Sequence, residues 1–246
     1  MRRFFTGGAV LMFAPSTKDY ETPPKGRLIQ RPSGVPVLKF ANSQVAELLF
    51  GGSILLSSVQ YYRGREDQWI GDDFENRILH PVDHYVFKGD KRDLHRTGPG
   101  IRSKGGSLHG VTLAYEGVSC FVLCFAVGAF DQLSGVMLGK EPDNYDACTE
   151  ILKPERLARA IYHTGRLPDA TPFKEIVHAP QIGMVKYRNM VRLGDTPYEP
   201  PSPFRKRLEF KSQNELRIAF YFKKPGLPPR LTITFSVPAK TLRRLS

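Results

Sequence analysis

The sequence has few cysteines and no long hydrophobic segment, and both shortages narrow the class of protein. Only three cysteines occur among 246 residues, and their apolar neighbours indicate reduced thiols in a cytoplasmic protein. No histidine joins Cys120 and Cys124 at zinc-ligand spacing, so we expect no structural metal. No apolar run reaches the roughly 18 residues that a membrane-spanning helix needs, so we expect no membrane partner.

The motifs of the common nucleotide-binding and hydrolase folds are also absent. The chain contains no G-x-x-x-x-G-K-[ST] loop and no G-x-G-x-x-G turn that opens a helix. It contains no G-x-S-x-G nucleophile elbow either. A P-loop enzyme and a Rossmann enzyme are therefore disfavoured.

Potential metal ligands are grouped in two places but match no binding motif. Acidic residues are dense between residues 66 and 75, without the D-x-D-x-D-G spacing of an EF-hand loop. His80, His84, His95 and His109 are separated by 4, 11 and 14 residues, which fits no compact ligand set. A metal-dependent nuclease is therefore a weaker alternative. Its carboxylates would be Asp67, Asp72, Asp73 and Glu75.

The N-terminal residues combine features of a signal peptide with those of an ordinary strand. Met1-Arg2-Arg3 is basic, and the following stretch of about ten residues is mostly apolar. Gly7 and Gly8 interrupt that stretch. We therefore favour a packed N-terminal strand, within an irregular arm that covers about residues 1–34.

Positive charge is concentrated in the last quarter of the chain. The formal net charge is +12, and residues 186–246 contain 14 basic and 4 acidic residues. This asymmetry favours a polyanionic partner, either nucleic acid or a phosphate-bearing cofactor. The alternative is a solvated basic surface that serves solubility alone.

Hydrophobic periodicity predicts many strands and few helices. Strands are expected at 35–40, 53–58, 183–191, 216–222 and 231–237, with a further pair at 111–115 and 118–127. Gly117 would form the turn of that pair. Helices are expected after Asn42 or Ser43, with a stop at Gly51 or Gly52, and from Pro154. The chain is therefore predicted to be a single α+β domain of two packed, mostly antiparallel sheets with few short helices.

The stretch from Phe204 to Lys224 joins a basic cluster, a polar turn and an apolar strand. Gln213 and Glu215 form a Q-x-E motif at the start of that strand. A carboxylate in this position is placed by a rigid element, so Glu215 is a candidate catalytic group. The alternative is that Glu215 only pairs with Arg217 or with a neighbouring lysine.

Four features follow one another in the order seen in a known family. They are the V-L-K-F strand with Lys39, a capped helix ending in glycine, the S-S-x-x-Y-Y run at 57–62 and the late Q-x-E. In this arrangement the chain resembles the ADP-ribosyltransferase superfamily of the Q-x-E type. It is also similar to uncharacterised bacterial and phage proteins in the runs 52–67 and 210–217. It departs from the family by having no Ser-Thr-Ser and by placing lysine where histidine or arginine is expected.

The resemblance implies a split pair of sheets that binds NAD as a substrate. It implies that Glu215 and Gln213 are catalytic. Glu215 would stabilise the cation-like ribose that forms when the bond to nicotinamide breaks. The NAD-binding residues that it implies are Arg31, Lys39, Ser57, Tyr61 and Tyr62.

The basic C-terminal quarter suggests that nucleic acid accepts the ADP-ribose. The residues of this surface are Arg205, Lys206, Arg207, Lys211, Lys223 and Lys224. The sequence thus predicts an NAD-dependent ADP-ribosyltransferase that acts on nucleic acid, as a toxin or in conflict with phage. The alternative is a non-catalytic protein that binds nucleic acid or takes part in phage assembly.

Overall fold

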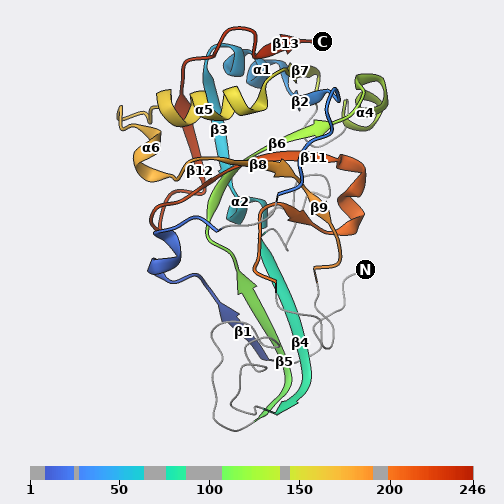
Figure 1. Ribbon diagram of the computed structural model, residues 1–246, viewed down its shortest axis with the longest axis vertical. Helices are drawn as coiled ribbons and strands as arrows, with labels where there is room; N and C mark the ends of the chain where they lie inside the picture. The colour runs from blue at the N-terminus through green and yellow to red at the C-terminus, as the bar shows by residue number, and fades with distance from the viewer. Residues whose placement is uncertain are drawn as a thin grey trace.

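The chain folds into a body built on one large sheet, from which a smaller sheet projects (Figure 1). The computed structural model describes residues 9–24, 28–63, 76–86, 107–138, 145–190 and 199–245. The strands are mostly antiparallel and the helices are few and short. The predicted α+β class is therefore confirmed.

The named strands form sheets of eight, three and two strands. The large sheet contains β2 (Val37–Ala41), β3 (Ser53–Ser58), β6 (Cys120–Val127), β7 (Ala147–Ile151), β8 (Gln181–Met184), β11 (Glu215–Tyr221), β12 (Arg230–Thr234) and β13 (Leu242–Arg244). The projecting sheet contains β1 (Ala9–Phe13), β4 (Arg77–Val86) and β5 (Ser107–Glu116). The third sheet pairs β9 (Lys186–Tyr187) with β10 (Arg205–Lys206). The helical elements are η1 (Thr17–Tyr20), α1 (Ser43–Phe50), α2 (Val59–Arg63), α4 (Phe130–Met137), α5 (Pro154–Thr164), α6 (Phe173–Ile176) and η2 (Leu208–Gln213).

The predicted pairing of 111–115 with 118–127 is wrong, because β5 and β6 belong to different sheets. β5 pairs with β1 and β4 in the projecting sheet, whereas β6 is central to the large sheet. In the link between them, Gly117 N donates to Asn76 O (2.9 Å) and Asn76 Nδ2 donates to Val118 O (3.0 Å). A Cβ on Gly117 would lie 2.2 Å from Asn76 Oδ1. The glycine therefore permits a close contact between segments and does not form a hairpin turn.

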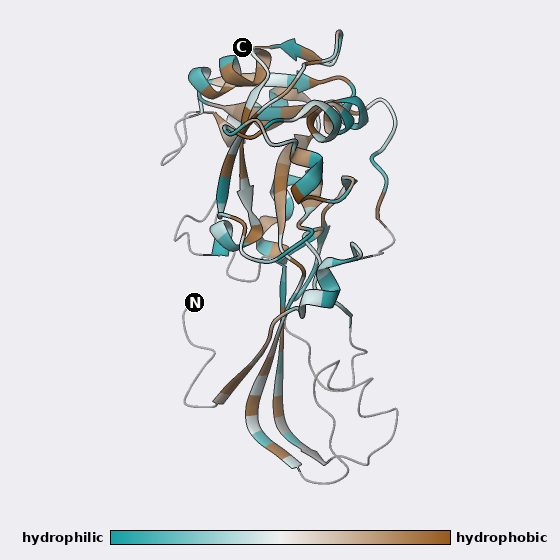
Figure 2. Cartoon of the chain, turned by 90° about the vertical axis from the view of Figure 1, so that its left-hand side faces the viewer, coloured by the Kyte–Doolittle hydropathy of each residue, from teal (hydrophilic) through white to brown (hydrophobic). Residues whose placement is uncertain are grey.

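β1 is the outer strand of the projecting sheet, so the predicted N-terminal strand is present from Ala9 onward, although most of its residues are exposed and not packed, and residues 1–8 lie outside the described ranges. It pairs in parallel with β5, and the rings of Phe13 and Tyr115 stack with centroids 5.0 Å apart. Figure 2 shows this sheet extending away from the body, with β1 apolar along its length and with apolar and polar residues mixed along β4 and β5. The region predicted as an irregular arm thus includes β1 and η1, and Ile29 forms a single bridge to Met184 of β8.

The core of the body lies on one face of the large sheet, beneath α5 (Figure 1). Leu216, Ile218 and Phe220 alternate along β11 on this face. They belong to the same buried cluster as Leu157 and Ile161 of α5, which recur at helical spacing. The apolar faces of the sheet and of the helix thus cover each other, and Glu215 and Arg217 lie on the opposite face of β11, at its start.

β6 is the strand from which the large sheet continues in two directions, through β3 and through β2. Along one edge it pairs with β11 over seven residues. Along the other edge, Val122 lies opposite Ser57 of β3, and Ala126 lies opposite Leu38 of β2. β3 continues to β12 as one wing, and β2 continues to β7 and β13 as the other. β2 and β3 therefore separate from each other along this edge.

The β2–α1–β3 unit is determined by local helix signals. Asn42 caps α1, because its Oδ1 accepts a hydrogen bond from Val45 N at 2.9 Å. Gly51 N closes the last turn on Glu47 O (2.8 Å), and Gly52 then turns the chain into β3 with a φ of +76°. The predicted helix, its cap and its glycine stop are confirmed.

We expect Gly52→Ala to lower the free energy of unfolding by about 2 kcal/mol or more. Its φ is +76°, and the added Cβ would lie 2.2 Å from Phe235 O, a backbone atom. Gly51→Ala is the matched control, because Gly51 has a φ of −74° and its Cβ would lie 3.4 Å from the nearest atom. Urea unfolding of both variants measures the difference, and equal stabilities would contradict this account of the turn.

Candidate functional site

The turn before β11 determines where the Q-x-E carboxylate lies. η2 ends at Gln213, and Asn214 follows in the left-handed conformation with a φ of 40°, which asparagine adopts more readily than most residues. Val127 N donates to Asn214 O at 2.9 Å, and Asn214 Nδ2 donates to Val127 O. Glu215 is therefore the first residue of β11, held where that strand meets the end of β6.

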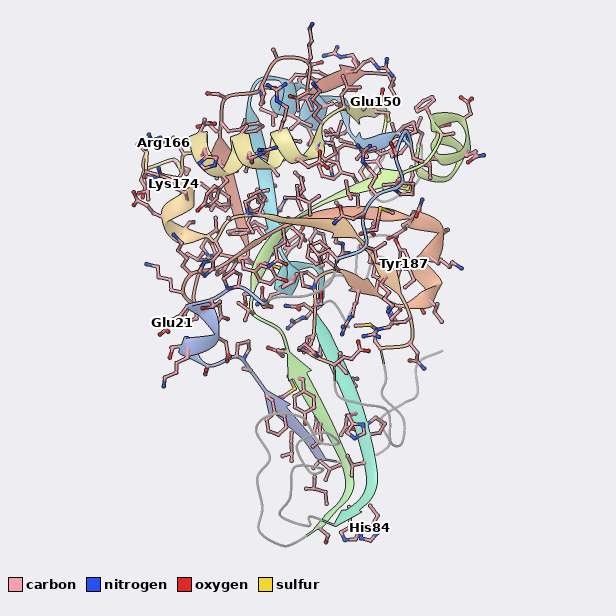
Figure 3. The ribbon with its side chains drawn as sticks, in the orientation of Figure 1. Glu21, His84, Glu150, Arg166, Lys174 and Tyr187 are labelled. Atoms are coloured by element: carbon pink, nitrogen blue, oxygen red, sulfur yellow. The ribbon has the colours of Figure 1, made fainter. Side chains whose placement is uncertain are left out.

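Glu215 is buried and bonded to two cations. Its Oε1 lies 2.6 Å from Lys206 Nζ, and its Oε2 lies 2.8 Å from Arg217 Nε. The three side chains are 8%, 4% and 2% exposed. The backbone N of Glu215 donates to the hydroxyl of Tyr187 at 2.8 Å, and Figure 3 shows Tyr187 on β9 beside β11. The ion pair with Arg217, offered above as the alternative to catalysis, is thus present.

Lys206 lies at the centre of this group, although the sequence assigned it to a nucleic-acid-binding surface. Its Nζ donates to Gln213 Oε1 and to Glu215 Oε1, each at 2.6 Å. The same ammonium group lies 4.7 Å from the ring centroid of Phe210. Lys206 therefore joins both members of the Q-x-E motif. We call Glu215, Lys206, Arg217, Gln213 and Tyr187 the Glu215 cluster.

The charges around Glu215 keep its carboxyl group ionised. Burial alone raises the pKa of Glu215, but the positive charges of Arg217 and Lys206 and their hydrogen bonds lower it from 4.5 to about 2. Burial also raises the pKa of the Tyr187 hydroxyl, and the charge of Glu215 adds to that rise. At neutral pH the cluster thus contains one carboxylate, two cations and a neutral phenol.

Lys39 reaches the same region from β2. Its Nζ donates to Cys124 O at 3.2 Å, between the residues of β6 that pair with β2 and those that pair with β3. Cys124 lies opposite Arg217 in the pairing of β6 with β11, so both side chains lie on the same face of the sheet. Burial raises the pKa of the Cys124 thiol, although the charge of Arg217 opposes that rise. Lys39 and a protonated thiol therefore border the Glu215 cluster.

The other predicted NAD-binding residues lie further away. Ser57 pairs with Val122 of β6, which places it on the face of Glu215 but about 16 Å from it between Cα atoms, from strand spacing and rise. The ring of Tyr61 lies 4.8 Å from the guanidinium of Arg230 and 5.6 Å from the ring of Tyr62. The structure thus places Ser57 and Tyr61 together near β12.

Tyr62 and Arg31 have neighbours of their own. Tyr62 packs against the main apolar core. Arg31 Nη1 donates to Val35 O at 3.1 Å, within the segment that leads into β2. Of the two first-strand candidates, Lys39 is therefore the one that forms a hydrogen bond with β6.

The six basic residues predicted to bind nucleic acid do not form one surface. Arg205, Arg207 and Lys211 lie on β10 and around η2, next to the start of β11. Lys223 and Lys224 follow the other end of that strand, and Lys223 Nζ donates to the carbonyl of Lys174 at 2.8 Å. Seven residues of β11, or about 20 Å, separate the two groups, and Lys206 is buried.

No catalytic or NAD-binding role was predicted for Arg217, Tyr187 or Cys124, although Arg217 was named as a possible ion-pair partner of Glu215. The E-x-R spacing of Glu215 and Arg217 is a usable signal, because residues two apart on a strand share one face. Tyr187 and Cys124 come from β9 and β6, far from Glu215 along the chain. Only the pairing of these strands brings them together.

Within the described ranges, no three histidine, cysteine, aspartate or glutamate residues are grouped so that they could hold a metal ion. The acidic residues 66–75, proposed above for a nuclease, and His95 lie outside those ranges. None of the helices in the described part of the chain is long and apolar enough to cross a membrane. No protein-family model, curated protein or solved structure matches the chain. Its function must therefore be inferred from its own residues.

We expect the Glu215 cluster to stabilise the fold less in acid. The pKa of Glu215 is about 2 in the folded protein against an ordinary 4.5, so its contribution is complete above pH 4.5 and decreases as the pH falls toward 2. The shift corresponds to about 3 kcal/mol of unfolding free energy. Urea unfolding at several pH values should show a weaker acid-dependent loss in Glu215→Gln than in the wild type. Glu209→Gln, at an exposed position, is the control. Parallel pH profiles for the wild type and Glu215→Gln would refute the assignment.

Proposed function

We propose that the protein is an NAD-dependent ADP-ribosyltransferase with Glu215 as its catalytic carboxylate. The main support is that Glu215 is ionised and lies opposite Ala126 of β6, next to the residues of β6 that lie between its pairing with β2 and its pairing with β3. A carboxylate with a pKa of about 2 keeps its negative charge at neutral pH, as stabilisation of a cationic ribose requires. The resemblance to Q-x-E transferases leads to the same residue.

In the proposed reaction, the bond between nicotinamide and C1′ of the attached ribose breaks. Nicotinamide leaves with the electron pair, and Glu215 stabilises the positive charge that develops on the ribose. A nucleophilic atom of the acceptor then bonds to C1′ and releases its proton. Lys206 and Arg217 are positioning residues in this scheme, because each holds one oxygen of the carboxylate.

The exposure of the neighbouring residues suggests the side from which NAD approaches. Glu215 is buried, but Lys39, Cys124 and Tyr187 beside it are each partly exposed. In this proposal the ribose enters past these three residues, and the ammonium of Lys39 neutralises the pyrophosphate. Ser57 and Tyr61 contact the far part of the dinucleotide, since they lie on the β12 side of β6.

The acceptor proposed for the reaction is nucleic acid. The described basic residues around the start of β11 are Lys186, Arg188, Arg205, Arg207 and Lys211. Arg188 and Arg205 share Glu199, and Arg207 pairs with Glu209. Two carboxylates therefore face five cations, and the excess charge lies beside the proposed catalytic group. Phosphates bound there would bring a nucleotide close to Glu215.

Glu215→Gln is expected to slow the release of nicotinamide from NAD by about 10²- to 10³-fold, as loss of one charge-stabilising group does. Chromatography of nicotinamide, with the full chain and with added RNA or DNA, measures the rate. Glu155→Gln is the control and should keep the wild-type rate, because Glu155 is exposed on α5, outside the proposed acceptor surface. If the wild type consumes no NAD with any acceptor, the proposed activity is excluded. Salt-dependent binding of nucleic acid without turnover would then support the non-catalytic alternative.

Replacement of Lys186 and Lys211 by alanine is expected to weaken nucleic-acid binding. The slope of log K against log salt concentration should become shallower by about one unit for each phosphate group that the variant no longer neutralises. The matched control is the double variant Lys223→Ala/Lys224→Ala, which removes two exposed charges at the other end of β11. This control should bind nucleic acid as tightly as the wild type. Fluorescence anisotropy with a labelled oligonucleotide over a range of salt concentrations tests both. Equal weakening in the two double variants would contradict an acceptor site at the Glu215 end.

A further inference from the structure

Two histidines lie side by side at the far end of the projecting sheet, away from the Glu215 cluster. His84 of β4 lies directly opposite His109 of β5 in the antiparallel pairing, and Figure 3 labels His84 at this end. Both side chains are exposed. Spacing along the sequence did not indicate the pair, because 25 residues separate the two positions. Strand pairing alone brings them together.

The two imidazole rings lie close enough together for both to contact one ion after a change of ring orientation. Their centroids are 4.3 Å apart and their planes differ by 15°. Two nitrogens that bind one tetrahedral Zn²⁺ at about 2.0–2.1 Å lie roughly 3.4 Å from each other. In the stacked arrangement the lone pairs of the two rings are nearly parallel, so binding of one ion requires the rings to turn toward each other about χ2, a torsion that is broad for histidine.

A neighbouring hydroxyl group can select the tautomer of one ring. Ser107 Oγ lies 2.8 Å from His109 Nε2. When Nε2–H donates to this hydroxyl, Nδ1 of His109 carries the free lone pair that a metal needs. Metal-binding histidines in proteins usually donate their second ring nitrogen in this way, which fixes the ring. Ser107 therefore supplies an outer contact of the kind that accompanies histidine ligands.

We propose that His84 and His109 form a surface site for a divalent transition metal ion of the Zn²⁺, Ni²⁺ or Cu²⁺ type. Imidazole nitrogen suits these ions, whereas Mg²⁺ and Ca²⁺ prefer oxygen ligands. Two protein ligands leave the remaining positions of the ion open to water or to a group from outside. The site is independent of the proposed NAD chemistry, because its residues belong to a different sheet.

Calorimetric titration of the untagged, metal-free full chain with Zn²⁺ tests the proposal. The wild type should bind one Zn²⁺ at its strongest site, and this site should disappear in His84→Ala and in His109→Ala. Ser107→Ala should weaken it by about tenfold, as loss of an outer hydrogen bond to a ligand does. His163→Ala is the control: it removes an exposed histidine of α5 and should leave binding unchanged.

Circular dichroism without metal verifies that each variant is folded before its titration is interpreted. Zn²⁺ should raise the melting temperature of the wild type and of His163→Ala, but not that of His84→Ala or His109→Ala. The proposal is overturned if the wild type takes up no Zn²⁺. It is equally overturned if either folded alanine variant, at position 84 or at position 109, binds Zn²⁺ with the affinity of the wild type.

Discussion

The carboxylate of Glu215, held between Lys206 and Arg217, is the constraint on which the arrangement of strands at this end of the large sheet depends. Lys206 comes from β10, Arg217 from β11, and the hydroxyl of Tyr187 reaches the same residue from β9. One acidic group thus attaches the two-stranded sheet to the large sheet. All three charges are buried, and Lys206 and Arg217 have Glu215 as their common carboxylate partner, so removing Glu215 would take the counter-charge from both cations in a poorly solvated place. The two sheets and η2 therefore have a common electrostatic anchor.

β6 gives this anchor its position relative to the rest of the fold. It pairs with β11 along one edge, and the other edge is divided between β2 and β3. At the division, Lys39 bonds to a carbonyl group of β6. Residues from the first strands and from the last quarter of the chain therefore meet across a single strand. The proposed chemistry uses this meeting point, where a fixed anion and a partly exposed cation face the same region.

Local signals predicted the local structure well. The cap at Asn42, the turn at Gly52 and the strand after Glu215 follow from residue types that act over a few positions. Long-range pairing did not follow from such signals. A glycine between two strands predicted a hairpin, but Asn76, just before β4, occupies that link and the strands diverge. Lys206 was predicted to lie on a basic surface, because that prediction counted charges along the chain. Such a count does not show that Lys206 is buried and bonded to Glu215, nine residues away. The sequence also did not indicate that His84 and His109 lie opposite each other, because this depends on the register of β4 and β5.

The pairing of β3 with β12 has a consequence for how the chain folds. Ser57 lies opposite Arg230, so β3 can pair with β12 only after most of the sequence has been synthesised. β11 joins β6, and β1 joins β5, across shorter but still long intervals, since Glu215 lies opposite Ala126 and Ala9 lies opposite Val111. Pairings of this kind require the closure of long loops before any contact offsets the lost entropy, which makes folding slow. During translation, β3 and β6 would expose unpaired edges, and the nascent chain would need protection from association until its late strands arrive.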